Sequence, residues 1–269
     1  MSPGRGLRGA LAFLTRAPVD RGHGAREVAG SVPWFPVAGA LVGLLVAGVY
    51  AAGVSVLPSL PAAVVAVAAG VLATGALHED GLADLADALG ARGPDDARRI
   101  MKDPTHGTFG VLALTLSVAA RAAAIASLGP WAALAWVPAA HAASRGASVG
   151  LLARARAGPR LEGLGPEEAH RGETGGLGVG TAAHLSEWEG SAALSIGLAV
   201  SALGVGFWAV PVGALVLAAT AGLGWLAARR LGGVTGDVIG AAQQVGEVLV
   251  LLLGAAAVTQ GWPGAVWWR

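Results

Sequence analysis

The chain has 269 residues, of which 54% are hydrophobic and 13% charged, with a mean hydropathy of +0.63 and a net charge of +1. So many apolar residues, arranged in recurring long runs, exclude a soluble globular fold and indicate a polytopic membrane protein. The absence of cysteine excludes disulfide scaffolds, thiolate metal sites and cysteine nucleophiles. Without a basic patch interleaved with aromatic residues, we expect no nucleic-acid partner.

The first 30 residues carry five arginines around a short apolar run, Leu7 to Val19. This run lacks both the length of a signal-peptide core and a clean cleavage site. We therefore predict that residues 1–30 form a cytoplasmic amphipathic segment, with a helix that lies on the membrane surface.

Seven apolar stretches, give or take one, approach the roughly 20 residues that a helix needs to cross a bilayer. They are Val37–Leu57, Leu60–Leu77, Phe109–Leu128, Trp131–Leu152, Ser191–Trp208, Val212–Ala228 and Val245–Gln260. No linker or break in composition divides them, so we predict a single domain, residues 1–269. The predicted fold is all-α: a membrane bundle of about seven transmembrane helices and an N-terminal interfacial helix.

The positive charges are distributed unevenly between the two sides of this predicted bundle. Five Lys and Arg precede the first span, four lie in 78–108, four in 153–190 and two at 229–230, whereas the opposite connections carry only Arg269. Positive residues favour the cytoplasmic side, so the N-terminus and the loops 78–108, 153–190 and 229–243 are predicted to face the cytoplasm. The C-terminus then lies outside, where Trp262, Trp267 and Trp268 suit an interfacial belt.

An acidic cluster follows the second apolar stretch. Four of the seventeen acidic residues, Glu79, Asp80, Asp84 and Asp87, lie within nine positions. In a helix Asp80, Asp84 and Asp87 share one face, spaced i, i+4 and i+7. Their mutual repulsion predicts a cationic partner, and a divalent metal completed by phosphate oxygens is the natural candidate. The alternative is a solvated helix face beside the membrane.

A second polar segment runs from a short helix predicted at Asp95–Met101 into the third span. Lys102 can bind a phosphate as a point charge, and free backbone N–H groups near Thr108 favour anions. We place Asp103 and His106 with them in the candidate site. An ordinary loop that joins two helices is the alternative.

A third polar segment opens the last span. Gln243 and Glu247 are one turn apart and Asp237 and Gln244 recur seven apart, so a helix turns these groups toward the protein interior. Ionisable groups at membrane depth are costly, and function is the default hypothesis for them. Packing with satisfied hydrogen bonds is the alternative for Glu247.

The predicted fourth span contains His141 and Arg145, one turn apart. Arg145 in an apolar bundle requires a carboxylate or phosphate partner, whereas His141 suits helix packing. We expect Arg121, in the third span, to snorkel outward. The loop 153–190 is interpreted as a mobile polar cover over the site.

Seven short motifs run along the chain in a recognisable order: Phe13–Val19, Pro33–Gly39, Thr74–Asp87, Ile100–Asp103, Gly107–Gly110, Gly233–Asp237 and Gly240–Ala241. Together they resemble the cobalamin synthase (adenosylcobinamide-GDP ribazoletransferase) family. The resemblance covers the chain nearly end to end, with departures at Leu85 and Ala88.

The resemblance implies a late step of vitamin B12 synthesis at the cytoplasmic face of the bacterial inner membrane. Adenosylcobinamide-GDP and α-ribazole, or α-ribazole 5′-phosphate, would be the substrates, and GMP would be released. We expect Mg²⁺ at Asp80, Asp84 and Asp87, with Glu79 as a further ligand. Catalytic roles are expected for Asp80, Asp84, Lys102, Asp103, Arg145, Asp237 and Glu247. Substrate contacts are expected from His78, His106, Thr108, Gln243 and Gln244. A homo-oligomer, or association with other corrinoid-pathway enzymes, is a further possible partner.

Three other classes of membrane protein are alternatives. A CDP-alcohol phosphotransferase also has an acidic helix, but it requires Arg where this chain has Asp84. A membrane prenyltransferase uses paired acidic helices, and this chain has one. A secondary transporter carries charges along a pathway, yet the polar motifs here gather on one side and no inverted repeat is found.

Overall fold

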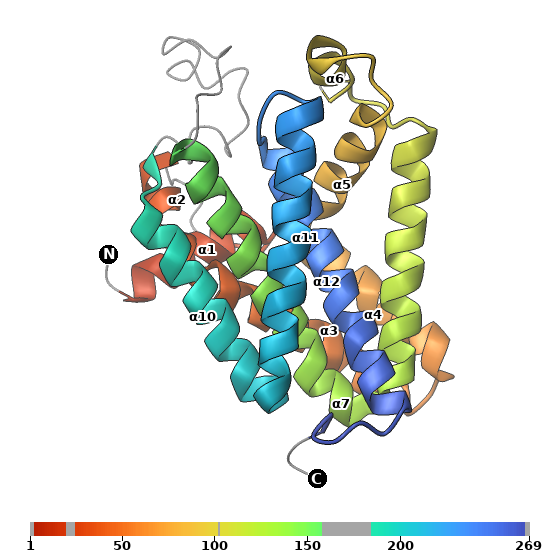
Figure 1. Ribbon diagram of the computed structural model, residues 1–269. Helices are drawn as coiled ribbons and strands as arrows, with labels where there is room; N and C mark the ends of the chain where they lie inside the picture. Colours follow the sequence, from red (N-terminus) through yellow and green to blue (C-terminus); the bar gives the residue numbers. More distant parts are fainter. Residues whose placement is uncertain (1–2, 20–24, 102, 158–183, 267–269) are drawn as a thin grey trace.

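The computed structural model describes residues 3–19, 25–101, 103–157 and 184–266, and these ranges contain helices and turns but no strand. This confirms the predicted all-α fold. The helices (Figure 1) are α1 (Pro3–Leu14), α2 (Ala25–Ser31), η1 (Val32–Trp34), α3 (Phe35–Gly53), α4 (Ser59–Thr74), α5 (Leu77–Ala88), α6 (Pro94–Ile100), α7 (Thr108–Ala157), α10 (Glu187–Val205), η2 (Gly206–Trp208), α11 (Ala209–Arg230) and α12 (Gly236–Thr259).

Several of these helices are long and apolar enough to cross a bilayer. Four segments qualify on their own: Arg26–Gly53, Thr108–Leu151, Glu187–Arg230 and Gly236–Thr259. The pair α4 and α5, bent by 93°, raises the number to as many as five in the described part of the chain. The prediction of about seven spans is not confirmed by this criterion. Two of the four segments are 44 residues long, and each contains two of the stretches that were predicted separately.

Both long segments are interrupted near their middle. In α7, Gly129 has φ 70° and ψ 166°, outside the helical region, and Pro130 follows it. Proline has no N–H to donate along a helix, so the hydrogen-bond ladder is broken there. Figure 1 shows the yellow-green and green parts of α7 as separate rods that meet near the lower end of the view. Gly206, with φ 59°, makes a comparable break between α10 and α11.

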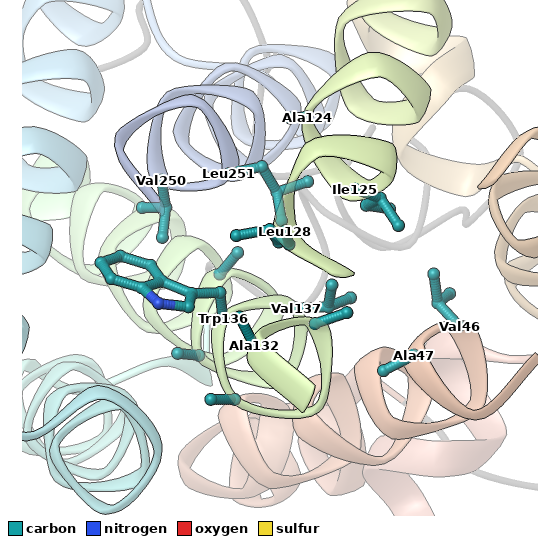
Figure 2. Packing of buried hydrophobic residues seen from close by; sticks show 14 of the residues in the cluster. Val46, Ala47, Ala124, Ile125, Leu128, Ala132, Trp136, Val137, Val250 and Leu251 are labelled. Carbon is teal, nitrogen blue, oxygen red and sulfur yellow. The ribbon is translucent and has the colours of Figure 1, made fainter. Parts of the chain in front are cut away.

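The apolar core lies where α3, α7 and α12 meet. Figure 2 shows Val46 of α3, Trp136 and Val137 of α7, and Val250 and Leu251 of α12 converging on one space. Each of these side chains is at most 5% exposed. Burial of such side chains in van der Waals contact holds the three helices together.

Small residues bring α7 and α10 into backbone contact. A Cβ added at Gly146 would lie 2.8 Å from the carbonyl oxygen of Ala193, and one at Gly197 would lie 2.8 Å from that of Ala142. Membrane helices use such small faces to approach closely. The abundance of glycine in the sequence is thus explained in part by helix packing.

The bend between α4 and α5 is built from two residues with left-handed backbone. Gly75 has φ 67° and Ala76 has φ 60°, and for a residue with a Cβ this region costs roughly 1–2 kcal/mol. The backbone N–H of Arg16 donates to the carbonyl of Ala73 over 2.7 Å and ties the N-terminal segment to this bend. Because α5 carries four acidic residues among its twelve, it is the polar part of the bent pair.

The N-terminal helix is packed on the bundle. Ala10 and Leu14 of α1 are buried in a cluster with Val28, Val32 and Phe35. The apolar face of α1 therefore contacts the rest of the protein. The prediction of a helix that lies on the membrane surface did not include this packing.

The end of the bundle that holds the C-terminal segment is aromatic. The indole N–H of Trp136 donates to the carbonyl of Ala265 over 2.9 Å, and Trp208 stacks on Trp262 with centroids 5.6 Å apart. In Figure 1 this end lies opposite α6. Trp267 and Trp268, predicted for the same belt, lie outside the described residues.

Candidate functional site

Helices α5 and α12 cross with their backbones in contact. A Cβ at Gly81 would lie 2.8 Å from the carbonyl oxygen of Asp237, and one at Gly240 would lie 3.4 Å from the Cα of His78. Thr235 caps the start of α12 by accepting a hydrogen bond from the N–H of Val238. The crossing therefore brings the first turn of α12, with Asp237, beside the acidic helix.

Two of the three aligned aspartates meet the imidazole of His106. The Nε2 atom of His106 lies 3.7 Å from Asp80 Oδ1, and its Nδ1 atom lies 3.4 Å from Asp84 Oδ1. The side chain of Asp80 is 66% exposed and that of Asp84 is 15% exposed. The first and second polar segments of the sequence thus form one surface site, with His106 between two carboxylates.

Asp87, the third aligned aspartate, binds backbone instead. Its Oδ2 atom accepts from the N–H of Gly107 over 2.7 Å, and its Oδ1 atom accepts from the N–H of Gly110 over 2.9 Å. A Cβ at Gly107 would lie 2.7 Å from the carboxylate, so glycine is required for this approach. Asp87 therefore fixes the turn that carries His106 and Thr108 at the start of α7.

The pKa of Asp84 is raised to about 6. Burial is the main cause, and the neighbouring charges of Asp80 and Asp237 act in the same direction, against a lowering effect from His106. This carboxyl group is consequently half-protonated in mildly acidic solution, and a cation placed beside it would favour its ionised form.

A second polar cluster lies inside the bundle, around Glu247. The Oε1 atom of Glu247 accepts from Arg121 over 3.4 Å, and its Oε2 atom accepts from Gln243 over 2.6 Å. His141 Nδ1 lies 3.1 Å and Arg145 Nη1 lies 3.7 Å from the same Oε2 atom. The side chains of Arg145 and Glu247 are only 3% and 2% exposed. As predicted, Gln243, Gln244 and Glu247 of the last span face the interior, whereas Asp237, predicted to do the same, is only partly buried and lies beside the acidic helix.

Glu79 belongs to this interior cluster and not to the exposed acidic face. Its Oε1 atom accepts from Arg121 over 3.0 Å and from Gln244 Nε2 over 3.2 Å. Gln244 in turn accepts from the hydroxyl of Ser117. The expectation that Arg121 snorkels outward is wrong: its side chain is 5% exposed and ion-paired to both glutamates. Sequence spacing gave no signal for this contact between distant helices.

Several polar atoms of the interior cluster have no partner among the described residues. They are the Nε and Nη2 atoms of Arg121, Nε of Arg145, Oε2 of Glu79 and Nδ1 of His78. These four residues border a cavity of about 10 Å³ that Gly70 and Thr74 of α4 also line. Such a volume has room for about one water molecule.

The predicted site residues therefore separate into two groups. Asp80, Asp84, Asp87, His106 and Asp237 surround the outer site. The other group is at most 8% exposed and lies inside: His78, Glu79, Arg145, Gln243, Gln244 and Glu247. Helix α5 contributes residues to both groups, because successive residues of a helix point in different directions.

The remaining predicted residues lie on the segment that precedes α7. Asp103 is exposed and accepts from the N–H and hydroxyl of Thr105 over 2.9 and 2.6 Å, which lowers its pKa. Thr108 is exposed at the first position of α7. Lys102 lies outside the described residues, as does most of the loop predicted to cover the site.

The carboxylates of the outer site suit a metal ion that is shared with substrate. Within the described ranges, no three His, Asp or Glu side chains are arranged to hold a metal by themselves. Mg²⁺, however, commonly takes one or two protein carboxylates and completes its shell with water and substrate phosphates. Asp80 and Asp84 provide two carboxylates, on either side of the His106 ring.

The apolar helices and the carboxylate site define a polytopic membrane protein with polar chemistry at one end of its bundle. The model of the cobalamin-5-phosphate synthase family matches residues 6–255. The chain belongs to this family.

Curated relatives match over nearly their whole length. A protein of Bradyrhizobium diazoefficiens is 39% identical over 259 residues, covering 93% of each chain. One of Ralstonia nicotianae is 38% identical over 255 residues, covering 92% of this chain and 93% of its own. One of Chlorobium phaeobacteroides is 36% identical over 259 residues, covering 93% and 97%. All three are named adenosylcobinamide-GDP ribazoletransferase. No solved structure matches the chain.

Proposed function

We propose that this chain is an adenosylcobinamide-GDP ribazoletransferase that completes the assembly of cobalamin. The observation that carries the proposal is the family match over residues 6–255, together with relatives of that name that align along 93% of the chain. The outer carboxylate site supports the proposal, because a diphosphate substrate needs its charge neutralised during transfer.

The proposed reaction is a phosphoryl-group transfer. A ribose hydroxyl oxygen of α-ribazole, or of its 5′-phosphate, attacks the corrinoid-linked phosphorus of adenosylcobinamide-GDP. A new P–O bond forms, the bond to the bridging diphosphate oxygen breaks, and GMP leaves with that electron pair. The product is adenosylcobalamin or its 5′-phosphate.

Each requirement of this reaction is proposed to be met by residues at or near the outer site. Asp80 and Asp84 would hold Mg²⁺, which when bound neutralises phosphate charge and favours departure of GMP. Asp237 lies close enough to raise the pKa of Asp84, and it is proposed to orient the attacking hydroxyl and accept its proton. Asp87 holds the Gly107–Gly110 turn in place. Lys102 is proposed to bind a phosphate oxygen of the departing GMP.

We further propose that the chain crosses the inner membrane seven times with the outer site in the cytoplasm. A continuous helix of 44 residues would be about 66 Å long at 1.5 Å per residue, twice the thickness of the hydrocarbon core. The breaks at Gly129 and Gly206 therefore support two crossings in each long segment. The excess of Arg and Lys in the loops on the side of α5 and α6 supports the orientation.

One assay tests the activity and the metal together. Detergent-purified protein is incubated with adenosylcobinamide-GDP and α-ribazole, in Mg²⁺ or in EDTA, and the products are separated by chromatography. We expect equal amounts of GMP and of the joined corrinoid in Mg²⁺ only. Failure to form the joined corrinoid in Mg²⁺ would overturn the proposed activity, and equal yields in EDTA would overturn the role of the metal.

A further inference from the structure

We infer that the buried Glu79–Arg121 ion pair positions the acidic helix, and that Glu79 is a positioning residue and not a metal ligand. The inference rests on the proposed function. It assigns a role to Arg121, which sequence reasoning placed outside the site, and it changes the role of Glu79.

The contacts of Glu79 connect three helices. Its Oε1 atom accepts from Arg121 of α7 over 3.0 Å and from Gln244 of α12 over 3.2 Å. Arg121 also donates to Glu247 of α12 over 3.4 Å. The first turn of α5 is therefore fixed to α7 and α12, two of the helices against which it packs.

Helix α5 needs such an anchor because it is not a continuation of α4. The left-handed residues Gly75 and Ala76 break the helical path, and the two helices are inclined at 93°. Rotation of α5 about its own axis is then set by its side chains. Glu79 fixes one end of α5, and Asp87, bonded to the N–H groups of Gly107 and Gly110, fixes the other.

The two anchors determine where the carboxylates between them point. Consecutive residues of a helix are about 100° apart, so an inward Glu79 turns Asp80 toward the surface. The structure has this arrangement, with Glu79 7% exposed and the side chain of Asp80 66% exposed. Asp84, one turn later, contacts the same histidine ring as Asp80. Loss of the pair frees α5 to rotate and separates the two carboxylates from Asp237.

Electrostatics alone gives the opposite prediction for Arg121. Removal of a positive charge near a cation site reduces repulsion and strengthens cation binding. Loss of positioning weakens it, and outer-shell partners of metal ligands typically contribute about 10- to 100-fold in metal affinity. The sign of the change in affinity therefore distinguishes a positioning role from a through-space charge effect.

The test is a titration of the purified full-length protein with Mn²⁺, followed by electron paramagnetic resonance, which needs no substrate. The variants are Arg121→Gln, Arg121→Lys, Glu79→Gln and the double variant Glu79→Gln/Arg121→Gln, with folding checked by gel filtration. The double variant removes both charges of the pair, so Mn²⁺ binding without the pair can still be measured if Arg121→Gln alone does not fold. Arg8→Gln, at an exposed arginine of α1, is the control.

We expect each folded variant of the pair to weaken Mn²⁺ binding about 10-fold or more, and the double variant to resemble the single ones, while Arg8→Gln is unchanged. Tighter or unchanged binding in the Arg121 variants, with weaker binding in Glu79→Gln alone, would show that Glu79 is a ligand and overturn the inference. If the wild-type protein binds no Mn²⁺, this inference and the proposed metal both fail. If the wild-type protein binds Mn²⁺ and the Arg121 variants bind it equally well, the inference is overturned and the proposed metal is not.

Discussion

At the scale of the residue, Asp84 is the carboxylate on which the outer site depends. It is more buried than Asp80 and contacts His106, and the negative charges of Asp80 and Asp237 raise its pKa. We expect Asp84→Asn to lower the rate of GMP release about 100-fold or more, because one charged oxygen ligand is lost where transition-state charge is neutralised. Asp95→Asn, at an exposed aspartate of α6 paired with Arg98, is the control. Near-normal turnover in Asp84→Asn would remove this residue from the mechanism.

The raised pKa of Asp84 predicts that cation binding depends on pH. Its pKa of about 6 means that the group is mostly protonated below that pH, so protons compete with a divalent cation there. Mn²⁺ affinity should rise as the pH increases through about 6 and level off near pH 7, measured by titration at fixed ionic strength. In Asp84→Asn this rise should be lost. A pH-independent affinity of the wild-type protein between pH 5 and 7 would contradict the prediction.

Relations between side chains could be predicted from the sequence where the residues lie close together in the chain. The i, i+4, i+7 spacing of Asp80, Asp84 and Asp87 placed them on one face, yet it could not separate their partners, since Asp87 binds N–H groups 20 and 23 residues away. The pairing of Glu79 with Arg121, 42 residues apart, leaves no periodic signal. Contacts of this kind are determined by how helices pack, and a single sequence does not encode that packing in its local pattern.

At the scale of the element, the crossing of α5 and α12 brings Asp237 to the acidic helix. A methyl group at Gly81 would lie 2.8 Å from the carbonyl oxygen of Asp237, so the backbones must separate to admit it. We expect Gly81→Ala to destabilise the protein by roughly 1–3 kcal/mol, as overpacking does, and to reduce transfer, because Asp237 moves away from Asp84. The measurements are the thermal unfolding midpoint in detergent and the rate of GMP release.

Gly48→Ala is the matched control for this substitution. Gly48 also lies in a helix, α3, but nothing lies within 4 Å of a Cβ placed there. Its variant should keep the activity of the wild-type protein and should not lower the unfolding midpoint, because Ala favours a helix more than Gly does. Equal effects of Gly81→Ala and Gly48→Ala would show that the close crossing has no part in placing Asp237.

Helices were predicted well in their positions and less well in their limits. The short helix expected at Asp95–Met101 is α6, Pro94–Ile100. The last span, expected at Val245–Gln260, begins nine residues earlier as α12, Gly236–Thr259, because Gln243, Gln244 and Glu247 satisfy one another inside the bundle. Polar residues suggest a loop in a hydropathy profile, whereas paired polar residues extend a buried helix.

At the scale of the whole molecule, the two polar clusters differ in their balance of charge. The interior cluster contains two arginines and two glutamates in mutual contact, so its formal charges cancel, which makes burial tolerable. Among the described residues, the outer cluster gathers Asp80, Asp84 and Asp237, with His106 as their one potential cation. The excess negative charge of the outer cluster attracts cations, whereas the ion pairs of the interior cluster hold the helices in position. Residues of α5 belong to both clusters.

The proposed seven crossings and their orientation can be tested with single cysteines, because the chain has none of its own. Ser55→Cys lies in the turn between α3 and α4, Arg92→Cys between α5 and α6, and Gln260→Cys after α12, and all three positions are exposed. We expect a membrane-impermeant maleimide to label Ser55→Cys and Gln260→Cys in intact spheroplasts, and Arg92→Cys only after lysis. Labelling of Arg92→Cys before lysis would reverse the orientation. Labelling of Ser55→Cys before lysis but of Gln260→Cys only after it would make the number of crossings even and exclude seven.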